Sequence, residues 1–327
     1  MRVAFVASDN GGGGHVRSHW PAAHLRAHGH HAVASTGYPT PGTVDVLVVH
    51  RPLDPDKCDA IAAHQAAGAV VLVDEDDLVH DVPAKFGFRP SDAAKARHLA
   101  AIEAADGLIV TTAALAGHYG PRARRTWVVP NRLPASVAQA RYYRSRHDTA
   151  IRVGWAGICW THREDLEWLA PHANRAFAGA VFSTIGDHAT PAVLRLSGQP
   201  TEVFPFQQDL GALHQLMARA DIGIVPLAPS PFTRAKSWLK ALEYMTLGKP
   251  VVAIRLPEQA RLITHGVDGF LADTPADFAD HVQVLIHDPD LRQRVGHAAR
   301  ATAAHHSLDH ASDWAQLIQE ATAMVDA

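Results

Sequence analysis

The sequence predicts an α/β fold built from two doubly wound, Rossmann-like domains. Three observations carry this prediction. Short apolar runs rich in β-branched residues alternate with stretches of helical periodicity, short loops connect them, and the whole alternation restarts near Ile151. Such alternation is typical of parallel sheets that are covered by helices on both faces.

Each half of the chain contains six predicted strands. Those of the first half lie at residues 3–7, 31–35, 45–50, 70–73, 108–111 and 127–129. Pro130 and Pro134 close this unit, and the polar run 139–149 is predicted to connect it to the second half. The strands of the second half are predicted at 151–155, 180–185, 201–204, 222–225, 251–254 and 270–271.

The composition is that of an ordinary globular protein. The chain has 327 residues, 47% hydrophobic and 19% charged, which is enough for two domains with their own cores. A net charge of -3 disfavours generic binding to polyanions. Cys58 and Cys159 fall in different predicted domains, so no disulfide framework is expected, which fits a reducing compartment. The first strand follows Met1 almost at once and no apolar run reaches membrane-spanning length, so we expect a cytoplasmic protein without membrane insertion.

The segment from residue 222 to 253 is the most informative part of the sequence. A buried strand is followed by two prolines, a helix predicted over 233–247, a Gly248 cap and a further strand. Lys236, Lys240 and Glu243 are spaced so that they share one face of this helix. Because the helix N-terminus lies at the carboxyl end of a parallel strand, together with Lys236 it suits a phosphate group.

This segment resembles the nucleotide-sugar-binding region of retaining glycosyltransferases with the two-domain GT-B fold, the group of glycogen synthase-like and mannosyltransferase-like enzymes. The likeness rests on an acidic residue, a short hydrophobic stretch and then Gly-x-Pro-Val-Val-Ala, here Glu243 to Ala253. It implies two domains that face each other across a cleft, with Glu243 on the ribose of the donor. The family carries another acid eight positions earlier, where this chain has Ala235.

The resemblance also implies the domain limits. Residues 1–147 form the acceptor-side domain, residues 148–307 bind the nucleotide sugar, and residues 308–327 form a helix that returns to the first domain. Besides Glu243, the expected donor-binding residues are Lys236, Ser237, Lys240, Gly157 and Arg163. Arg163 takes the place of the Arg and Lys that the family has after the first strand of this domain, with Thr161 as the expected N-cap of the next helix.

A glycine-rich loop follows the first predicted strand. It does not match a dinucleotide fingerprint, because Val16 stands where the third glycine would be, so NAD binding is not expected. Residues 9–19 are predicted to form a long loop that faces the cleft. By the resemblance, Gly12, Gly13 and His15 would approach the donor diphosphate or the acceptor, and Arg17 would add charge; the alternative is a merely flexible turn.

Four consecutive acids, Asp74 to Asp77, end another predicted strand at the same edge of the sheet. Carboxylates this close repel one another unless cations or hydroxyl groups meet them. Three interpretations stay open: a divalent metal site, hydrogen bonds that Asp76 and Asp77 accept from acceptor hydroxyls, or a solvated cluster at a helix N-terminus. His80 follows three residues later as a further candidate.

Two runs mix arginines with aromatic residues, the combination that holds phosphates and stacks bases. One contains Arg122, Arg124 and Arg125, and the other contains Arg141, Arg144 and Arg146. Short GT-B enzymes of viral type glycosylate bases in DNA, so the resemblance keeps DNA open as an acceptor. A solvated interdomain linker is the other interpretation of the same residues.

The expected function is therefore transfer of a sugar from a nucleoside diphosphate sugar to an acceptor hydroxyl, with retention of anomeric configuration. The resemblance implies no covalent nucleophile, no cofactor and no required metal. Arg163, Lys236, Asp77 and His80 are the catalytic candidates. Two alternatives remain: a DNA-modifying glycosyltransferase, and a sugar-nucleotide-binding protein without activity.

Overall fold

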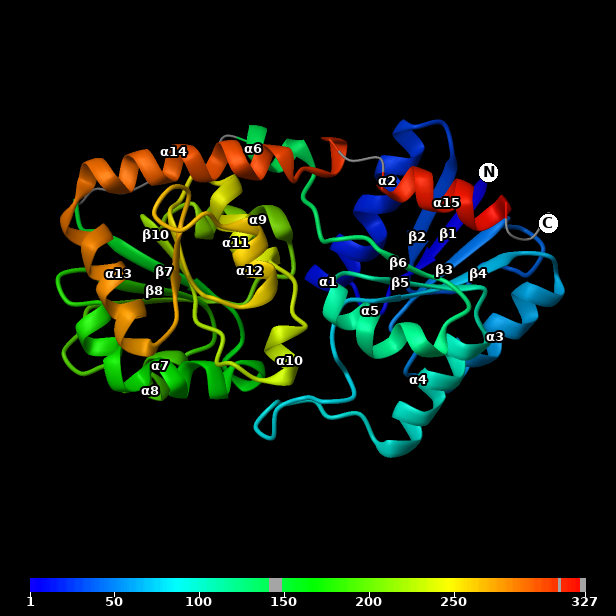
Figure 1. Ribbon diagram of the computed structural model, residues 1–327, viewed down its shortest axis with the longest axis horizontal. Helices are drawn as coiled ribbons and strands as arrows, with labels where there is room; N and C mark the ends of the chain where they lie inside the picture. The colour runs from blue at the N-terminus through cyan, green and yellow to red at the C-terminus, as the bar shows by residue number, and fades with distance from the viewer. Residues whose placement is uncertain (141–148, 311–312, 324–327) are drawn as a thin grey trace.

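The computed structural model describes residues 1–140, 149–310 and 313–323. Within these ranges the chain forms two parallel six-stranded sheets, one from each half, with helices on both faces (Figure 1). The predicted α/β fold with two doubly wound domains is confirmed.

The first sheet has the strand order β2-β1-β3-β4-β5-β6. Every neighbouring pair is parallel, so the carboxyl ends of all its strands lie at one edge. Its strands are β1 (Arg2–Val6), β2 (His31–Ser35), β3 (Val46–His50), β4 (Val70–Glu75), β5 (Gly107–Val110) and β6 (Thr126–Val128). The helical segments of this half are α1 (Gly12–Gly14), η1 (His15–His19), α2 (Trp20–Ala27), α3 (Pro55–Ala66), α4 (Asp92–Ala104), α5 (Ala113–Tyr119), η2 (Gly120–Arg122) and α6 (Ala135–Gln139).

The second sheet has the order β12-β11-β10-β7-β8-β9 and is also parallel throughout. Its strands are β7 (Arg152–Ala156), β8 (Val181–Gly186), β9 (Thr201–Pro205), β10 (Ile222–Val225), β11 (Val251–Ile254) and β12 (Phe270–Ala272). Its helical segments are η3 (Cys159–Thr161), α7 (Arg163–Ala176), α8 (Thr190–Val193), α9 (Leu210–Met217), α10 (Pro231–Arg234), α11 (Leu239–Thr246), α12 (Pro257–Leu262), α13 (Pro275–His287) and α14 (Pro289–His305).

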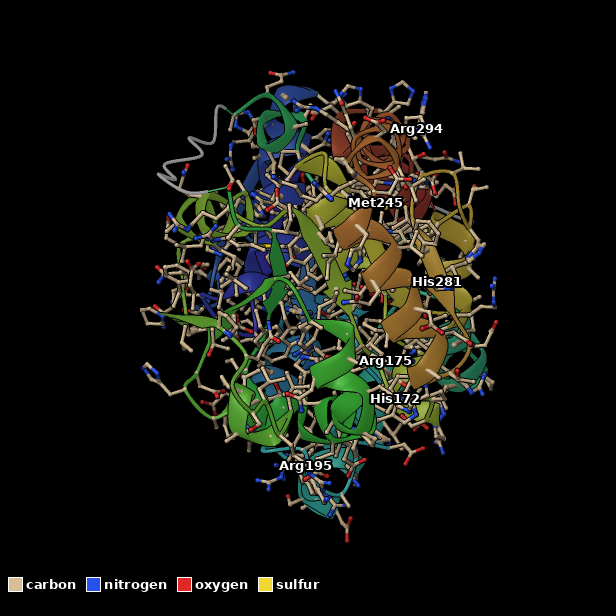
Figure 2. The ribbon with its side chains drawn as sticks, turned by 90° about the vertical axis from the view of Figure 1, so that its left-hand side faces the viewer. His172, Arg175, Arg195, Met245, His281 and Arg294 are labelled. Carbon is tan, nitrogen blue, oxygen red and sulfur yellow. The ribbon has the colours of Figure 1, made fainter. Side chains whose placement is uncertain are left out.

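Helices α7 and α13 lie side by side on this second domain, where Figure 2 labels Arg175 and His281. The Arg175 guanidinium joins them, because it pairs with Asp280 and donates to the Ala276 carbonyl oxygen at 2.9 Å. These helices contribute to the apolar core of the second domain, which includes Phe278, Val282 and Leu285 from α13.

The chain then crosses back to the first domain. After η4 (Leu308–His310), helix α15 (Asp313–Ala323) packs on the first sheet beside α2 (Figure 1). Trp314 of α15 is buried edge-on against Phe5 of β1, with ring centroids 5.4 Å apart. A core cluster joins these two residues with Leu317 and Ile318.

Two predicted segments differ from the structure. Residues 12–27 are helical without a break, so the expected loop over 9–19 is wrong beyond Gly11. A Cβ at Gly14 would lie 1.9 Å from the Asp9 carbonyl oxygen, which shows how closely the helix start approaches the preceding turn. The expected helix over 233–247 is divided into α10 and α11.

No helix in the described ranges is long and apolar enough to cross a membrane. Cys58 and Cys159 are both free thiols, as the sequence predicts.

Candidate active site

The carboxyl edges of the two sheets meet at a cleft of about 410 Å³. Ligands of doubly wound folds bind at such edges, because loops and helix N-termini gather there. Side chains of both domains line the cleft, and the polar or charged ones are Arg51, Asp76, Asp77, Asn131, Thr161, His162, Gln207, Lys236, Ser237, Lys240 and Glu243.

Helix α11 supplies Glu243 to the floor of the cleft. Its side chain is only 2% exposed, and its two carboxylate oxygens accept from Lys240 Nζ at 2.9 Å and contact His214 Nε2 at 3.3 Å. Burial alone would raise the pKa of Glu243, but Lys240 and His214 outweigh it and hold that pKa at about 2. Glu243 is therefore a carboxylate at neutral pH, and each oxygen keeps a lone pair for a further hydrogen bond.

Lys236 and Ser237 lie in the turn between α10 and α11, not on the long helix that the sequence predicts. The turn is held by tertiary contacts: the Trp238 indole donates to the Asn131 carbonyl oxygen at 2.8 Å, and the Asn131 amide donates to Ser237 Oγ at 2.9 Å. Lys236 still lines the cleft together with Lys240 and Glu243. Its Nζ lies 2.9 Å from Oδ1 of Asp77.

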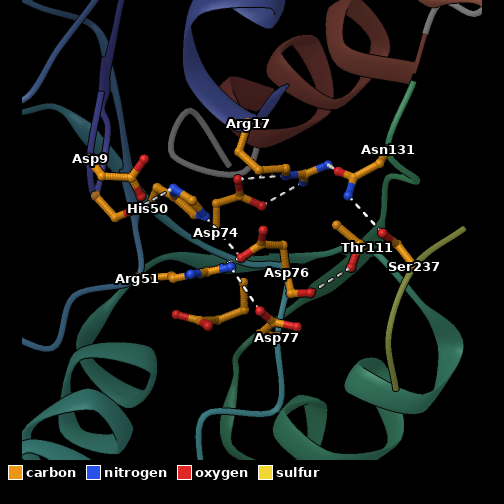
Figure 3. A network of polar contacts seen from close by, with 12 residues as sticks. Asp9, Arg17, His50, Arg51, Asp74, Asp76, Asp77, Thr111, Asn131 and Ser237 are labelled. Carbon is orange, nitrogen blue, oxygen red and sulfur yellow. Dashed lines mark hydrogen bonds and ion pairs between the residues drawn. The ribbon is translucent and has the colours of Figure 1, made fainter. Parts of the chain in front are cut away.

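The wall opposite is a charge network at the ends of β3 and β4 (Figure 3). Arg51 donates to Asp76, and its Nη2 donates to Asp77 Oδ2 at 3.0 Å, while His50 Nε2 lies 3.0 Å from Asp76 Oδ1. Arg51 has a left-handed backbone, with φ at 48°. Burial alone would raise the pKa of Asp76, but Arg51 and His50 hold it well below its usual range. Both members of the Arg51–Asp76 pair are therefore charged.

Arg17 does not reach the cleft, which corrects its expected role as an acceptor contact. It is 1% exposed and forms a two-point ion pair with Asp74, at 2.6 and 2.9 Å (Figure 3). Its Nη1 donates to the Val129 carbonyl oxygen at 2.8 Å, and its guanidinium lies 5.0 Å from the centre of the Trp314 ring. Arg17 therefore ties β4, β6 and α15 together from inside the first domain.

His80 is also not in the cleft, so the structure contradicts its place among the catalytic candidates. Its Nε2 lies 3.0 Å from Nδ1 of His98, whose Nε2 lies 2.5 Å from the buried Glu75 carboxylate. Burial and the neighbouring His98 lower the pKa of His80 to about 4, so it is neutral at pH 7. This chain of contacts lies within the first domain, away from the residues that line the cleft.

The acid cluster is thus distributed over several basic side chains. Asp74 meets Arg17, Glu75 meets His98, Asp76 meets Arg51 and His50, and Asp77 meets both Arg51 and Lys236. The described residues contain no group of three or more His, Cys, Asp or Glu side chains arranged to hold a metal ion. Only Asp76 and Asp77 of the four face the cleft.

Among the candidates of the glycine-rich segment, Gly12 and Gly13 line the cleft. His15 lies one turn further along the helix and does not. Its Nδ1 lies 3.0 Å from the Gly11 carbonyl oxygen, and its ring lies against His19. The cleft therefore receives the start of this helix, where backbone N–H groups lack intrahelical partners.

The segment after β7 also differs from its prediction. Arg163 is about half exposed, pairs with Glu167 one turn along α7, and does not line the cleft. The Gly157 N–H donates to the Ile185 carbonyl oxygen. Thr161 does not cap α7, because His162 is the N-cap residue. His162 lines the cleft, with its Nδ1 2.9 Å from Asp165. The second domain therefore presents no arginine to the cleft from this segment.

The basic run at 122–125 lies before β6, at the amino edge of the first sheet and so opposite the cleft. Each of its arginines has an acidic partner: Arg122 pairs with Glu103, Arg124 with Asp106 and Arg125 with Glu320. Arg141, Arg144 and Arg146 lie outside the described residues.

Several cleft or near-cleft residues escaped the sequence analysis, among them His50, Arg51 and His214. A signal existed for the first two, since they end a fully buried strand at the same edge as Asp76 and Asp77. His214 gave none, because its role depends on packing of α9 against α11.

Comparison with known proteins agrees with this geometry. Residues 150–288 match the family model described as "Glycosyl transferases group 1". A curated relative is the putative teichuronic acid biosynthesis glycosyltransferase TuaH of Bacillus subtilis (strain 168), 31% identical over 112 residues, which are 34% of this chain and 25% of TuaH. The match thus spans about a quarter of that relative's length.

Two solved structures share the fold along its whole length. HepE of Anabaena in complex with UDP has a TM-score of 0.68 at 17% identity, and sucrose-phosphate synthase of Thermosynechococcus elongatus has a TM-score of 0.74 at 15% identity. Each alignment covers 100% of both chains. The chain therefore has the GT-B fold of glycosyltransferases. The residues that match the family model all lie in its second domain.

Proposed function

We propose that this protein is a glycosyltransferase that moves a sugar from a nucleoside diphosphate sugar to an acceptor hydroxyl, with retention of anomeric configuration. The observation that carries the proposal is the position of Glu243, ionised and buried in the interdomain cleft, with Lys236 and Lys240 beside it. These three residues stand within the part of the chain that matches the group 1 family.

In this proposal Glu243 accepts hydrogen bonds from the ribose hydroxyls of the donor. Lys236, Lys240 and the start of α11 bind the diphosphate, because cations and free backbone N–H groups stabilise its charge. A UDP-type donor is favoured, since HepE was solved with UDP and with UDP-glucose. Gly12 and Gly13 lie across the cleft, where the acceptor or the transferred sugar would fit.

The chemistry requires electrostatic help more than a nucleophile. The bond between the anomeric carbon and the diphosphate oxygen breaks, a bond to the acceptor oxygen forms on the same face, and the acceptor proton passes to the leaving diphosphate. Negative charge grows on the diphosphate as its bond to the sugar breaks, so cations already fixed in the cleft lower the barrier. The cleft supplies Lys236 and Lys240 for this purpose, in place of the predicted Arg163.

The test is a screen of UDP- and GDP-sugars, with release of nucleoside diphosphate as the readout, in the presence of candidate sugar, lipid and DNA acceptors. Proton NMR of a fresh product would give its anomeric configuration. Inversion would reject the retaining mechanism. Binding of a nucleotide sugar without turnover on any acceptor would favour the alternative of a binding protein without activity.

DNA is the weaker acceptor candidate. The arginines of the 122–125 run are paired with acids at the edge opposite the cleft. Salt-dependent retention of the protein on DNA at low ionic strength, lost on replacing Arg141, Arg144 and Arg146 with Ala, would restore the DNA-modifying alternative.

We predict that turnover persists in EDTA. The carboxylates that a divalent cation would need, Asp76 and Asp77, are already neutralised by Arg51 and Lys236, and the two lysines supply charge to the diphosphate. The measurement is the rate of nucleoside diphosphate release before and after chelation. We expect this rate to change by less than about twofold, because removing unbound ions has only a small electrostatic effect. A complete loss that Mg²⁺ reverses would contradict this prediction.

A further inference from the structure

The Asp77 carboxylate lies between two cations from opposite domains. Lys236 Nζ of the second domain is 2.9 Å from Oδ1, and Arg51 Nη2 of the first domain is 3.0 Å from Oδ2. All three side chains line the cleft and are 19–25% exposed, so water and ligands reach them. Asp77 thereby forms a salt bridge across the domain boundary at the place where a donor diphosphate is expected.

Carboxylate and phosphate groups are bound by the same cations, through charge-assisted hydrogen bonds of similar length. Asp77 therefore resembles a bound anion that the chain itself provides. Arg51 is well placed to hold an external anion as well, because Asp76 and His50 fix the end of β3 and Arg51 Nη1 has no hydrogen-bond partner among the described residues.

We propose that Arg51 and Lys236 form a two-cation site for the donor diphosphate across the domain boundary, and that Asp77 occupies this site until the donor displaces it. The inference rests on the proposed function and extends it in two ways. It assigns a first-domain arginine to the donor, and it makes Asp77 an internal competitor of the diphosphate, not an acceptor contact. No covalent step is involved, because one anion replaces another.

The test measures the affinity of inorganic pyrophosphate and of UDP by calorimetry for the wild type and for Asp77→Asn. Removing the competing carboxylate should tighten both about threefold to tenfold, the range that corresponds to the loss of two partly exposed ion pairs. Asp59→Asn is the matched control, since it makes the same charge change at an exposed position of α3 outside the cleft. It should leave both affinities unchanged.

Two double variants separate displacement from simple repulsion between Asp77 and the ligand. Repulsion would act whichever cations are present, so Asp77→Asn would then still tighten pyrophosphate binding when one cation is gone. Displacement predicts that Asp77→Asn gives little gain once one cation is gone. Lys236→Ala/Asp77→Asn should then bind pyrophosphate about as tightly as Lys236→Ala, and Arg51→Asn/Asp77→Asn about as tightly as Arg51→Asn. Asparagine suits position 51, because it tolerates the left-handed backbone there. Circular dichroism and unfolding midpoints would verify that each variant folds.

The outcomes are distinct. A gain in Asp77→Asn that both double variants lose supports the two-cation site. An unchanged or weaker affinity of Asp77→Asn, in a wild type that binds UDP, overturns the inference and leaves the proposed function intact, as does a gain that both double variants retain. If neither the wild type nor Asp77→Asn binds UDP or pyrophosphate at millimolar concentration, the proposed donor function itself fails.

Discussion

Arg17→Met is expected to lower the free energy of unfolding by about 3 to 5 kcal/mol, the cost of breaking a buried ion pair on one side. Asp74, which is fully buried, would lose the two-point contact from the guanidinium. The Val129 carbonyl oxygen and the Trp314 ring would also lose their partner. The measurement is the midpoint of urea unfolding, followed by tryptophan fluorescence.

Two variants control this prediction. Arg17→Met/Asp74→Asn removes both charges and should recover part of the lost stability, because no unpaired charge stays buried. Arg122→Met removes an arginine whose ion pair is about half exposed and should change stability by less than about 1 kcal/mol. A midpoint for Arg17→Met equal to that of the wild type would show that Arg17 does not hold β4, β6 and α15 together.

Glu243→Gln is expected to weaken nucleoside binding about tenfold to a hundredfold, since hydrogen bonds to a charged group each contribute roughly 1.5 to 3 kcal/mol. The variant should also be less stable at neutral pH, because His214 and Lys240 lose a carboxylate partner. The shape of the side chain is nearly kept, so a cavity does not explain the loss.

The stability difference has a defined pH dependence. The folded-state pKa of Glu243, about 2, lies below the ordinary value of 4.5. The carboxylate therefore contributes stability above about pH 4.5, and this contribution is lost as the pH falls toward 2. Unfolding midpoints of the wild type and of Glu243→Gln should converge over that range. A difference that stays constant from pH 7 to pH 3 would contradict the ion contacts described for Glu243.

The sequence patterns predicted those features that depend on residues close together in the chain. The alternation of strands and helices predicted the two sheets, and Glu243 with its following Gly-x-Pro-Val-Val-Ala run was found from one short segment. What the sequence missed depends on contacts between distant segments. Arg17 and Asp74 are 57 residues apart, and nothing in the sequence shows that this arginine turns inward while Arg51 faces the cleft.

Two errors have specific physical causes. The resemblance implied a cation after β7 and Arg163 is the only one nearby, but the turn η3 and the start of α7 direct it outward to Glu167. The helix over 233–247 was expected to be continuous because its residues favour a helix, but contacts of Trp238 and Ser237 with Asn131 break it. Tertiary contacts outweighed local propensity at both places.

The most direct test of the central claim compares the affinities of UDP and uridine by calorimetry in three proteins: the wild type, Lys236→Ala and Glu243→Ala. If the diphosphate lies at Lys236 and the ribose at Glu243, Lys236→Ala should reduce the advantage of UDP over uridine and leave uridine binding nearly unchanged. Glu243→Ala should weaken both ligands by a similar factor. Equal affinities of all three proteins for UDP would contradict the placement of the donor in this cleft.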